Sequence, residues 1–248
     1  MGVDVGEGLR ACRVILRQVG ETRALLYNQK HMYFESRAEA GVMLAEQLGA
    51  YRYENTVVVA LSEGGVQVGG QIAAELHTTL TMMLSEAIEV PGEGITFGNL
   101  NQNGKFVYNG MFSTGEIEAY YNEFHGYLED QKRIKMSAIH QLLGSGGIVD
   151  ASMLRENNVI LVSDGLSNGS SLDTAFEYLK PLNVAKVVLA TPVASVVAVD
   201  RAHLLADELH ILSVTDNYLF TDHYYEVNDV PDRETTLESL NDVILRWR

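Results

Sequence analysis

The sequence predicts an α/β protein with a mainly parallel sheet that is covered by helices on both faces. Continuous apolar, β-branched runs such as "TVVVAL" (56–61) and "VILV" (159–162) are typical of strands that are buried on both sides. Helix-like apolar spacing occurs between such runs and also precedes them, as in "RAEAGVMLAEQLG" (37–49). An alternation of buried strands and helices favours a doubly wound parallel sheet.

The expected elements extend along most of the chain. We expect strands at 57–61, 80–84, 159–163, 186–191 and 209–213, with helices after the first of them, at about 171–180 and near 196–205. No internal repeat or low-complexity linker divides the sequence. We therefore expect a single domain over 1–248.

An insertion at about 90–145 interrupts the alternation. Its first part, "ITFGNLNQNGKFVYN" (95–109), has two β-rich arms around Asn103-Gly104, a strong signal for a hairpin turn. A long amphipathic helix, 115–142, follows. We expect the hairpin and this helix to form a hood outside the sheet. An exposed apolar face on the helix would suit a homodimer.

Composition limits the classes of partner. The chain has 18 basic and 33 acidic residues, a net charge of −15, and such a surface repels nucleic acid and anionic membranes. No apolar run reaches the roughly 18–20 residues that a membrane span needs, and the start of the sequence lacks a signal-peptide pattern. The single cysteine, Cys12, excludes an internal disulfide. We expect a cytoplasmic protein without nucleic-acid or membrane partners.

Two glycine-rich turns follow predicted strands, and ligands bind at the carboxyl ends of such strands. The first turn contains Ser62, Glu63, Gly64 and Gly65, and the second contains Ser163, Asp164, Gly165, Ser167, Asn168, Gly169, Ser170 and Ser171. The second turn has hydroxyls, glycines that permit close approach, and a following helix whose free N–H groups suit an anion. The alternative interpretation is structural: Ser170 or Ser171 only caps the helix and the glycines only turn the chain. The scattered histidines predict no metal site.

Several stretches, in order, resemble the type I phosphoribosyltransferases, particularly a bacterial subgroup of unassigned substrate. "YFESRAEAGVMLAEQL" (33–48) is similar to the subgroup's F-x-D-R stretch, and 57–76 to its diphosphate-loop segment. Residues 91–109 are similar to its hood hairpin, and "VILVSDGLSNGSS" (159–171) to the phosphoribosyl diphosphate (PRPP) motif. The resemblance covers roughly residues 30–240. It implies the family's hooded parallel-sheet fold.

The resemblance also implies roles for residues. In this family, a nitrogen nucleophile displaces magnesium-bound diphosphate from PRPP through an oxocarbenium-like transition state. By position, 167–171 would bind the 5-phosphate and Ser62 to Gly65 would face the diphosphate. Ser163 and Asp164 would lie at the ribose hydroxyls, with Asp164 as the catalytic residue. Mg²⁺ would be the cofactor if the protein is active.

The sequence departs from the family pattern at charged positions. Ser163 replaces the first acid of the family's pair, and Ser167 stands where purine-using members have a catalytic acid. Glu63 stands where the subgroup commonly has a basic residue, and like charges at close range cost a few kcal/mol. The stretch 84–93 carries Glu86, Glu89 and Glu93 in place of an Arg-Lys pair.

These features predict a phosphoribosyltransferase-family protein that binds a phosphoribosyl or nucleotide phosphate group, with weak or lost transfer activity. The expected partner is a small phosphorylated sugar or nucleotide. The alternative is a non-catalytic nucleotide-binding, sugar-phosphate-binding or assembly protein on the same fold. The sequence does not identify an acceptor substrate.

Overall fold

The structure, a computed structural model, describes residues 33–143, 148–228 and 230–246. Cys12 and the N-terminal features considered above lie outside the described residues. Within them, no helix is both long and apolar enough to cross a bilayer.

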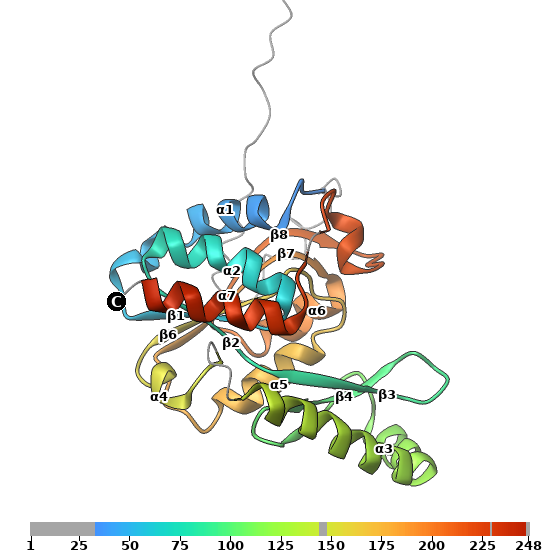
Figure 1. Ribbon diagram of the computed structural model, residues 1–248. Coiled ribbons are helices and arrows are strands. Elements are labelled where there is room, and N and C mark those ends of the chain that lie inside the picture. The colour runs from blue at the N-terminus through green and yellow to red at the C-terminus, as the bar shows by residue number, and fades with distance from the viewer. Residues whose placement is uncertain (1–32, 144–147, 229, 247–248) are drawn as a thin grey trace, which may run out of the picture.

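A five-stranded parallel sheet forms the centre of the protein, as predicted (Figure 1). Its strands are β1 (Thr56–Ala60), β2 (Thr79–Met82), β6 (Asn158–Val162), β7 (Lys186–Ser195) and β8 (Glu208–Thr215). Their order is β2-β1-β6-β7-β8, and each neighbouring pair is parallel. All five residues of β1 are buried, in agreement with its continuous apolar sequence.

Helices cover both faces of this sheet, which confirms the predicted fold class. In β1, Val58 faces one hydrophobic cluster and Val57 faces the other, because successive strand side chains point to opposite faces. The first face is covered by α1 (Arg37–Gln47), α2 (Glu63–Leu76), the 3₁₀ turn η3 (Gly49–Tyr53) and α7 (Arg233–Arg246). The second is covered by α4 (Ala151–Leu154), α5 (Ser170–Leu179) and α6 (Val196–His203). A second 3₁₀ turn, η4 (Thr221–Tyr224), follows β8.

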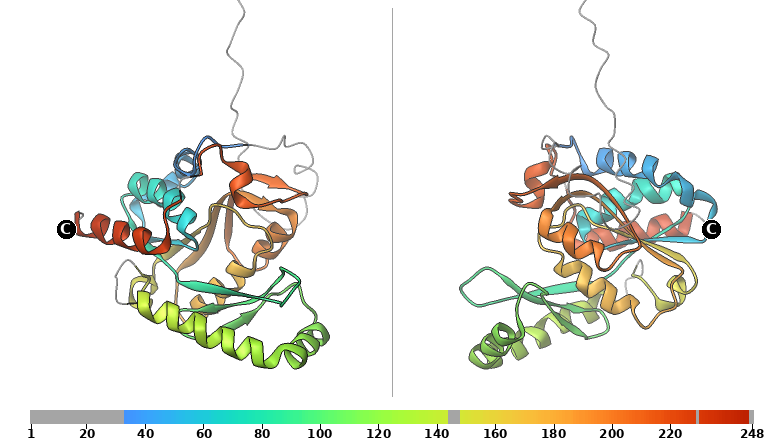
Figure 2. Two further views of the ribbon diagram at one scale, coloured as in Figure 1. Left: turned by 45° about the vertical axis from the view of Figure 1, so that its right-hand side comes forward. Right: turned by 180° about the vertical axis from the view of Figure 1, so that it is seen from behind.

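The hood is a separate antiparallel sheet with one long helix along it (Figure 2). It consists of β3 (Ser85–Glu89), β4 (Thr96–Asn101), β5 (Phe106–Tyr108) and α3 (Thr114–Leu142). Strands β4 and β5 form the predicted hairpin, and Gly104 adopts the positive φ of +79° that favours glycine in such a turn.

Strand β3 and helix α7 are two of the elements that were not predicted from the sequence. Strand β3 buries one of its five residues, Ile88, so its sequence lacks a clear alternating apolar pattern. Helix α7 begins in a stretch that is rich in acidic residues. It nevertheless buries Leu237 and Leu240 in the cluster that includes α2 and β2.

Helix α3 begins with a capping box, in which the side chains of Ser113 and Glu116 each accept the backbone N–H of the other residue. Phe124 departs from helical geometry and marks a kink. Much of the apolar side of α3 packs on the hood sheet, where Leu128 is buried. Tyr127 and Ile134 are exposed on the same helix, so a smaller apolar surface remains than the sequence suggested.

Phe97 is the centre of the hood core. Its side chain is fully buried, and its ring lies 5.3 to 6.2 Å from those of Phe106, Tyr108, Phe112 and Tyr120. We expect Phe97→Ala to cost about 3–5 kcal/mol within the hood. Hydrogen exchange should accelerate across 85–142 while β6 and β7 keep their protection. Tyr127→Ala, at an exposed aromatic, is the control, and an equal loss of protection in β6 would contradict a separate hood core.

Candidate functional site: two loops at the switch point of the sheet

Two loops meet at the carboxyl edge of the sheet. β1 and β6 are neighbours, but the chain leaves β1 for α2 on one face and leaves β6 for α5 on the other. Such a divergence creates the crevice where open parallel sheets bind ligands. Both predicted glycine-rich turns lie there, one after each strand.

Ser62 and Asp164 connect the two loops. The Ser62 hydroxyl donates to Asp164 Oδ1 at 2.7 Å and accepts the Gly65 N–H at 2.9 Å, which caps α2. A Cβ at Gly64 would lie 2.0 Å from Asp164 Oδ2, so this approach requires glycine. The structure therefore brings together residues that the sequence predicted as parts of two different subsites.

Arg37, which the sequence analysis did not name as a site residue, binds the other oxygen of Asp164. Its side chain is 2% exposed, and its Nε donates to Asp164 Oδ2 at 2.8 Å. Nη2 donates to Asp222 at 2.5 Å and Nη1 to Asn228 at 3.1 Å, while the guanidinium lies 4.4 Å from the centre of the Tyr225 ring. Burial alone would lower the pKa of Arg37, but the bond and charge of Asp164 outweigh it and raise that pKa. Arg37 is the arginine of the stretch that resembles the F-x-D-R motif, and this motif was the sequence signal that could have identified it as a site residue.

Tyrosines close the site from the segment that follows β8. Tyr225 donates to the backbone carbonyl of Asp164 at 2.5 Å. Tyr218 lies against Gly165, where an added Cβ would be 2.3 Å from the tyrosine oxygen. Burial raises the pKa of Tyr218 to about 12, so its phenol is neutral at physiological pH. Tyr224 and Tyr225 are buried, whereas Phe220 is 62% exposed.

The second loop presents backbone donors at the start of α5. Gly169 precedes the helix with φ +76°, and Asn168 accepts the Ser170 N–H at 3.0 Å. Among the described residues, no acceptor is recorded for the N–H groups of Ser167, Asn168, Gly169 and Ser171. Two contacts with β7 hold the loop in place: Leu166 forms a bridge with Ala194, and the Ser195 hydroxyl donates to the Ser167 carbonyl at 2.5 Å. These donors form a concave site for an anion.

Ser163 does not replace the missing acid. Its hydroxyl donates to the Gly165 carbonyl at 2.9 Å, within its own loop. Both oxygens of Asp164 already accept bonds from Arg37 and Ser62. In the described part of the chain, no group of three or more His, Cys, Asp or Glu could hold a metal. Mg²⁺ usually binds through one or two carboxylates together with substrate phosphates, so an Mg²⁺ site at this position would depend on the bound ligand.

Two of the acidic side chains expected at the diphosphate side, Glu63 and Glu86, have cationic partners. Arg233 of α7 bonds both of them, and Lys135 of α3 bonds Glu86 at 2.9 Å. Glu93 accepts a bond from the neutral side chain of Tyr120 within the hood at 2.9 Å. The negative charge of Glu63 and Glu86 is therefore compensated by cations from α7 and α3, and α7 was not predicted from the sequence.

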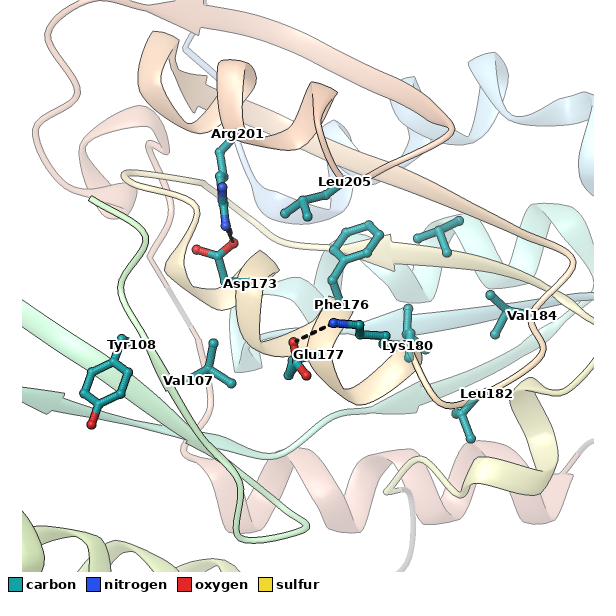
Figure 3. Close-up of a pocket in the computed structure, with 12 residues that line it drawn as sticks. Val107, Tyr108, Asp173, Phe176, Glu177, Lys180, Leu182, Val184, Arg201 and Leu205 are labelled. Carbon is teal, nitrogen blue, oxygen red and sulfur yellow. Dashed lines mark hydrogen bonds and ion pairs between the residues drawn. The ribbon is translucent and has the colours of Figure 1, made fainter. Parts of the chain in front are cut away.

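A cavity of about 480 Å³ lies between β5 of the hood and helices α5 and α6 (Figure 3). Arg201 and Asp173 meet at one end of it, with a separation of 2.6 Å. The same pair also lines a smaller space of about 270 Å³, which includes Asn168 of the second loop.

Comparison with known proteins agrees with the resemblance seen in the sequence. Two curated Mycobacterium tuberculosis proteins, each named "Putative phosphoribosyl transferase", are 26% identical over 182 residues, 73% of this chain. The chain spans 40% of the length of these curated relatives. The Thermus thermophilus protein TT1426 matches with a TM-score of 0.66 and 27% identity, over 87% of this chain and 99% of its own. No protein-family model matches.

The Arg37–Asp164 pair makes the site sensitive to one substitution. Arg37→Met would leave a buried carboxylate with only Ser62 as a partner, which we expect to cost about 3–5 kcal/mol of unfolding free energy. Urea denaturation measures this cost. The control is Arg52→Met, which removes a surface pair with Glu75 and should cost about 1 kcal/mol or less. Equal losses in the two variants would show that Asp164 does not depend on Arg37.

Proposed function

We propose that this chain, which has the fold of the type I phosphoribosyltransferases and resembles them in its motifs, binds the 5-phosphate of a phosphoribosyl or nucleotide ligand on residues 167–171. The supporting observation is the set of backbone N–H groups at the start of α5 that have no acceptor in the described part of the chain. These dipoles act at hydrogen-bonding distance, so they attract an anion even in a chain of net charge −15. A phosphorylated sugar or nucleotide is the ligand class that this fold and loop suit.

Transfer activity is proposed to be weak or absent. Displacement of diphosphate from C1 of the ribose requires groups that stabilise the developing positive charge and the leaving group. Asp164 is engaged by Arg37 and Ser62, and Ser163 bonds its own loop. Ser167 supplies no acid–base group where purine-using members have one. These contacts favour the second candidate, a non-catalytic protein on the same fold that binds a nucleotide or sugar phosphate.

Titration calorimetry with ribose 5-phosphate tests the phosphate loop. We expect Asn168→Asp to abolish detectable binding, because its carboxylate can still accept the Ser170 N–H but places a negative charge at the anion site. Gly169→Val should also abolish binding, since position 169 has a positive φ and lies close to Arg201.

Gly126→Val is the matched control, because a Cβ there meets nothing within 4 Å. Circular dichroism should show that the Asn168→Asp protein keeps its fold. Unchanged binding in both loop variants would place the phosphate site elsewhere.

A transfer assay tests the second part of the proposal. The unmodified protein is incubated with PRPP and a range of nucleobases, with and without Mg²⁺. Rapid turnover would exclude the non-catalytic interpretation.

A further inference from the structure

An ion-pair network crosses from the hood to the first turn of α2. Lys135 bonds Glu86 at 2.9 Å, Glu86 bonds Arg233, and Arg233 bonds Glu63. The four residues come from α3, β3, α7 and α2, so segments far apart in the sequence meet here. Their side chains are between 15% and 34% exposed, which shields the pairs partly from water and salt.

Arg233 has donor capacity beyond these bonds. Its Nε donates to Glu63 and its Nη1 to Glu86. For Nη2, no partner is recorded in the part of the chain that the structure describes, and the side chain is 27% exposed. A planar guanidinium with a free edge is well suited to phosphate oxygens.

The network adjoins the loop that follows β1. Glu63 is the first residue of α2, directly after Ser62, whose hydroxyl bonds Asp164. Gly64 packs against that same carboxylate. Arg233 therefore brings a positive charge to the loop where the subgroup that this chain resembles commonly has a basic residue of its own.

We propose that Arg233 is the cation of the diphosphate side of the site, and that Glu63 and Glu86 pair with it when no diphosphate is bound. This inference rests on the proposed function. A ligand with a 5-phosphate and a diphosphate at C1 competes with the two carboxylates for Arg233. A ligand with only the 5-phosphate leaves the network unchanged. Arg233 therefore determines specificity between these two classes.

The consequence is that Glu63 and Arg233 act in opposite directions on diphosphate binding. Removing the cation should weaken PRPP binding. Removing the Glu63 charge should strengthen it, because Arg233 then has one competitor fewer. A purely structural network predicts something different, since loss of either partner would then loosen the same contact and affect both ligands alike.

Calorimetric titration of the full chain with PRPP and with ribose 5-phosphate separates these cases. We expect Arg233→Met to weaken PRPP binding about tenfold or more, and Glu63→Gln to strengthen it by about threefold or more. Ribose 5-phosphate affinity should change by less than about twofold in both variants. Arg133→Met, at an exposed pair on α3, makes the same change in net charge and should alter neither affinity.

The outcomes are distinguishable. Weaker binding of both ligands in both variants would show a structural network and overturn the inference. If Arg233→Met binds ribose 5-phosphate normally and loses no affinity for PRPP, the inference about Arg233 is wrong but the proposed function stands. Failure of the unmodified protein to bind either ligand would overturn the proposed function as well. Glu63→Gln retains Arg233, so the test stands even if Arg233→Met does not fold.

Discussion

The contact between Arg37 and Asp164 is the interaction on which the rest of the site depends. A buried guanidinium is tolerated only where its donors are bonded, and Arg37 bonds Asp164, Asp222 and Asn228. One side chain therefore ties the start of α1 to the end of β6 and to the segment after β8. The guanidinium also makes a cation–π contact with the Tyr225 ring, and the Tyr225 hydroxyl donates to the backbone carbonyl of Asp164.

This arrangement divides the site into two parts with different chemistry. Around Asp164, Arg37 and Ser62 each donate one bond to a different carboxylate oxygen, and the remaining lone pairs can still accept bonds. At the start of α5, in contrast, backbone donors have no acceptor among the described residues, and Leu166 and Ser195 hold the loop in place. An anion would therefore meet a preformed set of donors there.

The tertiary structure also shows that some of the acidic side chains are paired with cations. A net charge of −15 disfavours the approach of anionic molecules at long range, but it does not describe any single site. Glu63 and Glu86 share Arg233, and Lys135 adds a second cation from the hood. Formal charges cancel within this group of four. These ion pairs therefore connect the hood, α7 and the start of α2.

The sheet, the hood hairpin and the two loops could be predicted from the amino-acid sequence, because buried strands and turn glycines are local patterns. Residues 163–171 were recognisable for the same reason. Which side chains neutralise one another became visible in the folded protein alone. Arg37 and Asp164 are 127 residues apart, and Arg233 and Glu63 are 170 apart. No local period encodes such pairs, since they form only where the sheet brings the ends of distant elements together.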